Sequence, residues 1–405
     1  MSMKENEIQV LGHDSKNGWR HLWPWFLAFV VVALIVGILI GRFAIRESQI
    51  VNLRPLGEST IDSALQSTVD SLLREKMTEI VAQSGQAIVM EVETGEIRAM
   101  VGLQKRFDGE FEPCQNFGHQ QEPGSLMRGV SMLAVLEDGE GINLGTEVET
   151  GNGIFYYDGS VVKDHNWHRG GYGKLTMEEV LMFGSNVGVC RLVDEVYGNN
   201  PQRYFDRLAQ MSFGESDSLY DLPCLKPMAF TAPRDSCWTK SKLAWHSFGY
   251  ERRVAPLQVL TFYNAIANNG RMMEPMLHRR DALVINPQIA HEESIQQIQE
   301  AMYHSVSEGL GHKAETEIVK VAGLTGTSQV SQGKSEDGVD YNDNGYCLSF
   351  CGYFPAEQPC YSIIVSMNKI GLPASGGGMA GPVFRQIVEY ICEREIALQN
   401  ITSAR

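Results

Sequence analysis

One uninterrupted apolar run near the N-terminus restricts this chain more than any other feature. Residues 26–40 read FLAFVVVALIVGILI and contain no charged or strongly polar side chain. Counted from Trp23, the apolar stretch has 18 residues, enough for roughly 27 Å of helix, close to the ~30 Å hydrocarbon core of a bilayer. Trp19, Trp23 and Trp25 lie at one end, as interfacial aromatic residues do. We therefore expect a membrane-spanning helix over residues 23–43.

A cleaved signal peptide is the alternative interpretation of this run. The sequence GRFAIRESQ that follows offers a poor small-x-small cleavage site, which favours an uncleaved anchor. Charge barely decides the orientation, because three basic residues lie on each side: Lys4, Lys16 and Arg20, then Arg42, Arg46 and Arg54. The short N-terminal tail and the large C-terminal mass favour N-inside, C-outside, with a cytoplasmic tail over 1–22.

Composition excludes some classes of function. The net charge of −15 argues against nucleic acid as a partner, because a duplex requires clustered Lys and Arg. The eight cysteines form no CxxC pair, so we predict no metal site and no cofactor. A disulfide between Cys224 and Cys237, or between Cys347 and a neighbour, stays open if the compartment is oxidising. The favoured interpretation is that several cysteines are small core residues.

Hydrophobic patterning predicts an α+β domain after a short stalk. Residues 61–80 have helical spacing behind a Ser59–Asp62 capping box, and Thr94-Gly95 indicates a hairpin within 86–102. Further helices are expected over 125–137, 176–196, 256–268 and 381–395, and strands over 317–330, 346–355 and 360–369. Residues 212–243 are predicted to be an irregular insertion. This order predicts an antiparallel sheet, built from both ends of the sequence, with helices on both faces.

Three short motifs carry the candidate chemistry. EPGSLMRG (122–129) places a serine at the start of a helix, FGSNVG (183–188) follows in a helical region, and VAGLTGTSQ (321–329) lies on a strand. Serine acyl-transfer enzymes use a serine with a base one helical turn later, because the i to i+3 spacing puts both side chains on one face. They add a second serine with an asparagine, and a strand that binds the substrate's carboxylate.

These motifs resemble the E-P-G-S-x-x-K, S-S-N-V-G and V-A-G-K-T-G-T-A-Q elements of class B penicillin-binding proteins. The segments TIDSALQ, TGEIRAMVG, SFGYERRVAPLQVLTFYNAIANNG, SFCGYFPAEQPCYSIIVSMNK and MAGPVF follow in the family's order, so the resemblance covers roughly 60–392. It implies a penicillin-binding transpeptidase fold, like that of serine β-lactamases. It also implies a peptidoglycan D,D-transpeptidase of cell division or elongation. The implied partners are a stem peptide or β-lactam, and a membrane glycosyltransferase or division-complex protein.

Three departures from the family pattern indicate impaired catalysis. Arg128 stands where the resemblance implies the catalytic lysine, and it stays protonated, so it cannot act as a general base. Gly184 replaces the first serine of the second motif, and Leu324 replaces the lysine that faces the carboxylate. The remaining site residues are Ser125, Ser185, Asn186, Thr325, Gly326 and Thr327. Since losing a general base costs about 10²–10⁴-fold, we predict a pseudoenzyme.

Two alternatives stay open: an active transpeptidase or carboxypeptidase that uses an unusual base, and a sensor of β-lactam or peptidoglycan. The cluster Lys163, Asp164, His165 and His168 could supply another base, but a solvated polar loop is favoured. Lys320 is expected ~13 Å from position 324, too far to replace the lost amine. The run SGGGMAGP (375–382) is interpreted as a strand-to-helix loop, not a phosphate cradle, because it lacks GxxxxGK[ST].

The predicted organisation follows from these patterns. It comprises a cytoplasmic tail (1–22), an anchor (23–43), a stalk with an amphipathic helix (44–85), a transpeptidase-like domain (86–395) and a C-terminal tail (396–405). The resemblance places the domain on the periplasmic side of the inner membrane. The pedestal domain usual in class B proteins is not predicted here, and the helix near 60–82 is the candidate remnant.

Overall fold

The computed structural model describes residues 57–403, except residues 116, 215–228, 231 and 330–344. The anchor predicted over residues 23–43 and the tail before it lie outside the described residues. Within the described part of the chain, no helix is both long enough and apolar enough to cross a bilayer. Cys224 is also outside it. Cys190, Cys347 and Cys351 are buried free thiols, so the interpretation as core residues is confirmed for these three.

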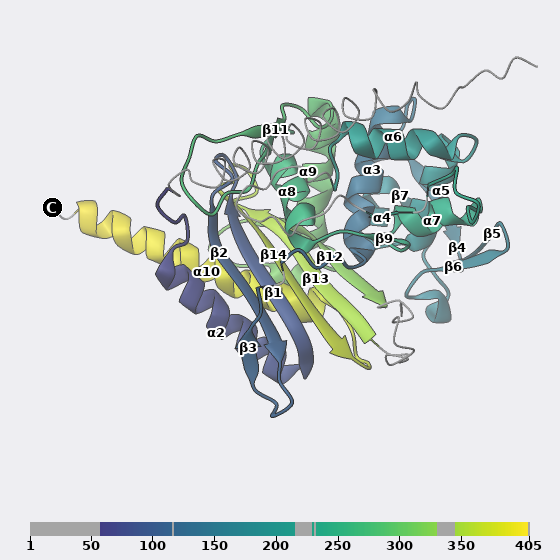
Figure 1. Cartoon of the computed structure of the whole chain (residues 1–405). Helices are drawn as coiled ribbons and strands as arrows, with labels where there is room; N and C mark the ends of the chain where they lie inside the picture. Colours follow the sequence, from purple (N-terminus) through teal and green to yellow (C-terminus); the bar gives the residue numbers. More distant parts are fainter. Residues whose placement is uncertain (1–56, 116, 215–228, 231, 330–344, 404–405) are drawn as a thin grey trace, which may run out of the picture. The chain divides into compact units, whose positions relative to one another are not determined.

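A six-stranded antiparallel sheet forms the centre of the fold (Figure 1). Its strands, in spatial order, are β12 (Ala322–Gln329), β13 (Gly345–Phe354), β14 (Tyr361–Ile370), β1 (Ala82–Glu91), β2 (Ile97–Lys105) and β3 (Phe111–Pro113). Ile88 of β1 pairs with Ile364 of β14 on one side and with Met100 of β2 on the other. The prediction of a sheet built from both ends of the chain is confirmed.

Two long helices cover one face of the sheet (Figure 1). Helix α2 (Ser63–Glu79) buries a stripe of side chains at helical spacing, and α10 (Gly376–Ser403) buries a second stripe beside it. The shared core includes Leu65, Val69, Leu73, Met77, Val383, Phe384 and Ile387. Because α2 belongs to this core and β1 begins at Ala82, the predicted stalk boundary at residue 85 falls inside a strand. The compact unit begins at Glu58.

Asp62 alone caps α2. Its carboxylate accepts hydrogen bonds from the N–H groups of Ala64 and Leu65, both at 3.0 Å. Ser59 was predicted to share a capping box with Asp62, and this is wrong: its hydroxyl accepts a hydrogen bond from the N–H of Ile61, outside the helix. Asp62 also accepts a hydrogen bond at 2.6 Å from Arg394, which joins α2 to α10. This contact lowers the pKa of Asp62 to about 2.

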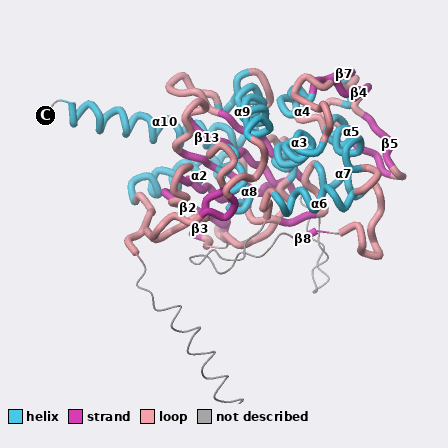
Figure 2. The backbone as a smooth tube through the Cα atoms, turned by 90° about the horizontal axis from the view of Figure 1, so that it is seen from above, coloured by secondary structure: helices cyan, strands magenta, loops and turns pink. Residues whose placement is uncertain are grey.

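The opposite face carries the remaining long helices. Helix α8 (Pro256–Ala267) is buried at every position, and its polar side chains, Gln258, Thr261 and Asn264, all form hydrogen bonds. The others are α3 (Met127–Asp138), α4 (Met177–Phe183), α5 (Asn186–Tyr197), α6 (Pro201–Gln210), α7 (Ser241–Ser247) and α9 (Glu292–Ser307). Figure 2 shows α3, α4, α5, α6 and α7 gathered at one side of the molecule. Helices therefore lie on both faces, as predicted.

Short elements complete the described part of the chain. The small two-stranded pairs are β4 (Glu147–Gly151) with β7 (Gly173–Thr176), β5 (Ile154–Tyr157) with β6 (Ser160–Lys163), β8 (Ala229–Phe230) with β9 (Arg252–Arg253), and β10 (Met272–Met273) with β11 (Val284–Asn286). The 3₁₀ turns are η1 (Gly124–Leu126), η2 (Trp167–Arg169) and η3 (His312–Ala314). Strand β8 lies inside the span predicted to be irregular (212–243), and α7 begins at its end.

Two predicted elements differ from the structure because of glycine. The helix expected over 176–196 is broken at Gly184, whose φ of +64° ends α4, and Ser185 then caps α5. The run predicted to be a loop over 375–382 is helical from Gly376 onward. A Cβ at Gly376 would lie 2.0 Å from the carbonyl oxygen of Gly326, so this glycine permits a close approach of α10 to β12.

Candidate active-site cleft

The three motifs meet at one pocket of about 320 Å³. The turn η1 and the start of α3 bring one motif, the α4–α5 junction brings the second, and β12 brings the third. Six of the predicted site residues line the pocket: Ser125, Arg128, Gly184, Asn186, Thr325 and Thr327. Ser185, Leu324 and Gly326 are not among its lining residues.

Ser125 occupies the position expected of a nucleophile. It lies in the 3₁₀ turn directly before α3 and is 8% exposed. Its hydroxyl donates a long hydrogen bond of 3.5 Å to the carbonyl of Thr327. Within the described residues this hydroxyl makes no hydrogen bond to a basic side chain.

Arg128 takes the place next to Ser125 and is held by one asparagine. Its Nη2 and Nε donate to Oδ1 of Asn186 at 2.9 and 3.3 Å. Burial lowers the pKa of Arg128 to about 10, and the nearby charge of Asp164 opposes that shift. The guanidinium therefore remains a cation at neutral pH, and it cannot accept a proton from Ser125.

Gly184 makes room for this arginine. Its φ of +64° is one that side-chain-bearing residues adopt rarely, and a Cβ built there would lie 2.6 Å from Nη1 of Arg128. A serine at this position would meet both obstacles. Gly184 was predicted as the loss of a hydroxyl. In the structure the guanidinium also lies close to the Cβ position that Gly184 lacks, so the two departures from the family pattern meet in space.

Ser185 points away from the pocket. It is fully buried, and its hydroxyl donates to both carboxylate oxygens of Asp164, at 2.9 and 3.0 Å. It also accepts the N–H of Gly188 at 2.9 Å, which caps α5. The hydroxyl is thus committed to the helix, although Ser185 was predicted as a catalytic partner. The second motif contributes only Asn186 and Gly184 to the pocket wall.

Asp164 is the buried member of a cluster that was predicted to be solvated. It is 1% exposed and accepts hydrogen bonds from Ser185 and from the N–H of Val187, and burial raises its pKa. The prediction is therefore wrong for Asp164. Two other members of the cluster, Lys163 and His165, line the pocket. The Lys163 amine lies 4.5 Å from the ring centroid of Trp167. The Lys163 carbonyl accepts a hydrogen bond at 3.0 Å from the Asn186 side chain.

On β12, alternate side chains face two environments. Leu324 is 3% exposed and belongs to the core, where its Cδ1 would lie 2.9 Å from a Cβ at Gly129 of α3. Thr325 and Thr327 line the pocket, and the Thr327 hydroxyl accepts the N–H of Gly376 at 2.9 Å. The leucine has therefore turned a position implied to bind substrate into a packing position.

Sequence reasoning did not single out Tyr250 and Leu310, which also line the pocket. Tyr250 lies within the SFGYERRV segment that supported the resemblance, so a signal existed, and burial raises its pKa. Leu310 has no such signal; its N–H donates to the carbonyl of Met182 and holds the segment after α9 against α4. Lys320 pairs with Glu357 at 2.8 Å and is not among the lining residues.

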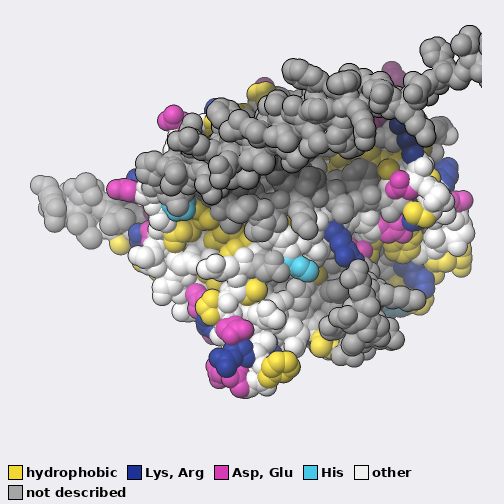
Figure 3. Space-filling view, in the orientation of Figure 1, with side chains coloured by type: hydrophobic (Ala, Val, Ile, Leu, Met, Phe, Trp, Pro, Cys, Tyr) yellow, Lys and Arg dark blue, Asp and Glu magenta, His cyan; other side chains and the backbone are white. Residues whose placement is uncertain are grey.

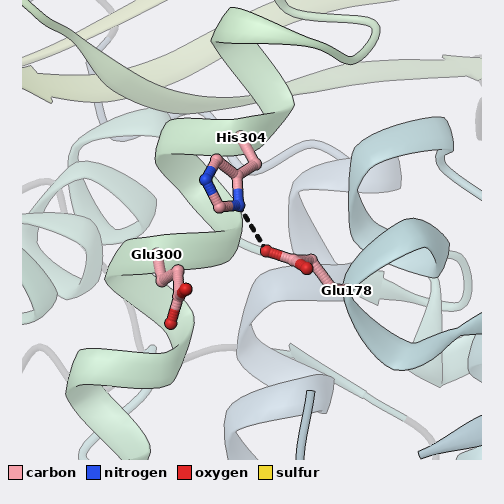
Figure 4. A group of neighbouring side chains, drawn as sticks. All are labelled: Glu178, Glu300 and His304. Carbon is pink, nitrogen blue, oxygen red and sulfur yellow. Dashed lines mark hydrogen bonds and ion pairs between the residues drawn. The ribbon is translucent and has the colours of Figure 1, made fainter. Parts of the chain in front are cut away.

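One group of possible metal ligands lies outside the cleft. Glu178 of α4 and Glu300 and His304 of α9 have ligand atoms within 4.8 Å of one another. Figure 4 shows the His304 ring directed at Glu178, with Nδ1 and Oε1 2.5 Å apart. This contact raises the pKa of His304. The three side chains are partly or largely exposed, and we interpret the pair as a link between two helices.

Comparison with known proteins shows to which family the chain belongs. The family model described as the penicillin-binding protein transpeptidase domain matches residues 85–389. The chain belongs to this family. Among curated relatives, it is 27% identical over 83% of its length to penicillin-binding protein PbpB of Mycolicibacterium smegmatis. It is 25% identical over 81% to stage V sporulation protein D of Bacillus subtilis, and 26% identical over 81% to peptidoglycan D,D-transpeptidase FtsI of Escherichia coli.

This transpeptidase-domain chain spans about half the length of those relatives, at 54%, 52% and 54%. Solved structures share the fold. The apo TP domain of Burkholderia pseudomallei penicillin-binding protein 3 gives a TM-score of 0.69 at 24% identity, covering 82% of this chain and 94% of that one. Penicillin-binding protein 3 of Mycobacterium tuberculosis, complexed with aztreonam, gives 0.68 at 23% identity, covering 83% and 78%.

Proposed function

We propose that this chain is a membrane-anchored member of the peptidoglycan synthesis machinery whose transpeptidase domain is catalytically impaired and acts by binding. One observation supports this most strongly. The side chain one helical turn after Ser125, which lines the same pocket, is a partly buried guanidinium that donates to Asn186 from Nε and Nη2. A neutral amine at that place would accept the serine proton, whereas a protonated guanidinium only donates.

The size of the expected defect follows from this chemistry. Losing a general base typically lowers the rate by about 10²–10⁴-fold. Replacing the second lysine by the buried Leu324 removes a charge-assisted contact to substrate, which affects binding and not activation. An ordinary turnover number of about 10 s⁻¹ reduced by both losses leaves no useful reaction.

A β-lactam labelling experiment tests the proposal. Purified full-length chain in detergent is incubated with a fluorescent penicillin, and the intact mass is recorded, with Ser125→Ala as the matched control. We expect no adduct that depends on Ser125. A stable acyl adduct on the wild-type chain, absent from Ser125→Ala, would show that the serine is activated and would overturn the proposal.

A second candidate function, a transpeptidase or carboxypeptidase with an unusual base, is favoured by one specific observation. His165 lines the same pocket as Ser125, and burial together with the Arg128 charge lowers its pKa, so the imidazole is neutral at pH 7. Its Nε2 lies 3.3 Å from the Tyr172 hydroxyl. This candidate requires product from stem peptides that is lost in both Ser125→Ala and His165→Gln; absence of product with the wild-type chain removes it.

The anchor and the partners complete the proposal. A single span over residues 23–43 would hold the domain on the periplasmic side of the inner membrane, beside a membrane glycosyltransferase or division-complex protein. The names of the relatives, which include a D,D-transpeptidase and a sporulation protein, support a role in wall synthesis. Protease digestion of intact and permeabilised spheroplasts tests the topology, because a domain cut in intact spheroplasts lies outside the cytoplasmic membrane.

A further inference from the structure

The charge of the pocket is opposite to that of the chain. The protein carries a net charge of −15, and on the face in Figure 3 acidic and basic side chains are mixed over the described surface. Among the described residues that line the pocket, Arg128 and Lys163 are cations, His165 is a neutral imidazole, and none is acidic. A pocket lined this way in an acidic protein attracts anions.

Arg128 is a cation in this pocket whose N–H donors are not all used in hydrogen bonds within the described part of the chain. A guanidinium has five N–H donors. Those of Arg128 that form hydrogen bonds are on Nε and Nη2, and both donate to Oδ1 of Asn186, a neutral acceptor. It forms no ion pair within the described residues. Asp164, whose charge acts on Arg128, accepts hydrogen bonds from Ser185 and the Val187 N–H, and within the described residues it accepts none from the guanidinium. A guanidinium without a carboxylate partner on a pocket wall is ready to receive one.

Hydroxyl groups surround the space in front of this cation. The Thr327 hydroxyl accepts the Gly376 N–H, so its own proton is available to a ligand. Ser125 donates only a long 3.5 Å hydrogen bond, and Thr325 also lines the wall. Gly377, in the first turn of the 28-residue helix α10, lies at the same wall, where the helix dipole is positive. All these features favour a bound carboxylate.

We propose that Arg128 is the binding residue for the carboxylate of a peptide ligand, and that the cation facing this carboxylate lies on α3 instead of on β12. The inference rests on the proposed function, because it assigns Arg128 a role in ligand binding at the position where an active enzyme of the family would hold its general base. The ligand class is a peptide with a free C-terminal carboxylate. Gly184 contributes to the same site, because a Cβ at this position would lie 2.6 Å from Nη1 of the Arg128 guanidinium.

The test compares a peptide ending in a free D-alanine carboxylate with the same peptide ending in an amide. Binding to the full-length chain in detergent is measured by calorimetry, with inorganic phosphate as a competitor. We expect the acid to bind at least about tenfold more tightly than the amide, the effect of one charge-assisted contact. Arg128→Gln should remove this preference, and Lys320→Gln, which removes an exposed cation outside the pocket, should retain it.

The outcomes separate the two proposals. Equal binding of acid and amide to the wild-type chain overturns the carboxylate assignment, as does a preference that persists in a folded Arg128→Gln variant. If phosphate binds and neither peptide does, the ligand class is wrong. If Arg128→Gln does not fold, Arg128→Lys provides the second variant, with the preference expected to fall but not vanish. Intact mass after β-lactam exposure of the same samples reports on acylation, so a Ser125 adduct contradicts only the proposed function.

Discussion

The two walls of the cleft each depart from the family's motifs at a position where the resemblance implies a lysine, and the two departures differ. On the helical wall, the position implied to hold a lysine carries Arg128, which remains a cation in the pocket and is matched by Gly184. On the strand wall, the corresponding loss leaves Leu324, which has left the pocket and joined the core against α3. One substitution keeps a charge at the site, and the other exchanges a charge for packing.

This difference teaches that a departure from the family's motifs can be accommodated by the residues around it. A bulky cation in place of lysine requires space, and Gly184 provides it. A leucine in place of lysine requires a place in the core, and Gly129 provides part of that space, because Leu324 Cδ1 would lie 2.9 Å from the Cβ that Gly129 lacks. Each wall is internally consistent, and four substitutions test that consistency.

The largest expected effect is on the strand wall. Leu324→Ala removes a side chain that is 3% exposed, and large-to-small changes in a core cost about 2–4 kcal/mol in the free energy of unfolding. Leu324→Met is the matched control, because a volume-conserving change should cost less than about 1.5 kcal/mol. Urea unfolding of both variants provides the measurement. An unchanged Leu324→Ala would mean that this leucine does not support the core.

The next effect is on the helical wall. Gly184→Ser must adopt a positive φ and displace Nη1 of Arg128, so we expect a loss of about 1–3 kcal/mol in the free energy of unfolding. Gly151→Ser is the control, since Gly151 has a φ of +55° but no atom within 4 Å of its missing Cβ.

The double variant Gly184→Ser with Arg128→Lys sharpens this test. The shorter amine removes the close contact, but it also removes the two hydrogen bonds from Arg128 to Asn186, so Arg128→Lys is measured alone as well. The loss in the double variant should be smaller than the sum of the two single losses. Identical losses for Gly184→Ser and Gly151→Ser would show that the arginine contact contributes nothing.

A smaller effect is expected where β12 meets α10. Thr327→Val removes the acceptor of the Gly376 N–H and should cost about 1 kcal/mol. Thr325→Val, at the neighbouring pocket position, removes a hydroxyl that has no hydrogen bond within the described residues, so it should be nearly neutral. Thermal melting of the two variants measures the difference, and equal melting temperatures would contradict the assigned role of Thr327.

The smallest effect concerns the support behind the helical wall. His304 of α9 pairs with Glu178 of α4, the helix that ends at Gly184 (Figure 4). Because this contact raises the folded-state pKa of His304, its stabilisation is fully present below about pH 6.5, the unfolded value, and is lost as pH rises through the folded pKa. His304→Gln should therefore lower the melting temperature by about 1–3 °C at pH 6 and by less at pH 8.5. A difference independent of pH would refute the ion pair.

Much of the fold follows from patterns in the sequence, and the misses have physical reasons. The sheet strands and α8 carry strong apolar signals, and the three motifs predict which segments meet. The break at Gly184 was missed because periodicity does not reveal a single left-handed residue or the cap that follows it. The burial of Asp164 was missed because its partners, Ser185 and Val187, come from a distant segment.

The cleft shows the same limit. The order of the motifs predicts that residues 125, 128 and 327 belong to one site, and in the structure all three line one pocket. The contact between Arg128 and the space at Gly184 joins two motifs, and no local pattern encodes it. The early start of α10 was missed for a similar reason. A glycine run usually indicates a loop, but here the glycines let a helix approach a strand edge.

The position of β1 has a consequence for how this chain is made. β1 is synthesised early, yet one of its two neighbours in the sheet is β14, which emerges only near the end of translation. Until then β1 presents an unpaired edge to its surroundings, and such edges recruit foreign strands. A nascent chain stalled before residue 361 would therefore depend on holdase chaperones, and premature stop codons in this region should produce aggregation-prone fragments, not partly folded domains.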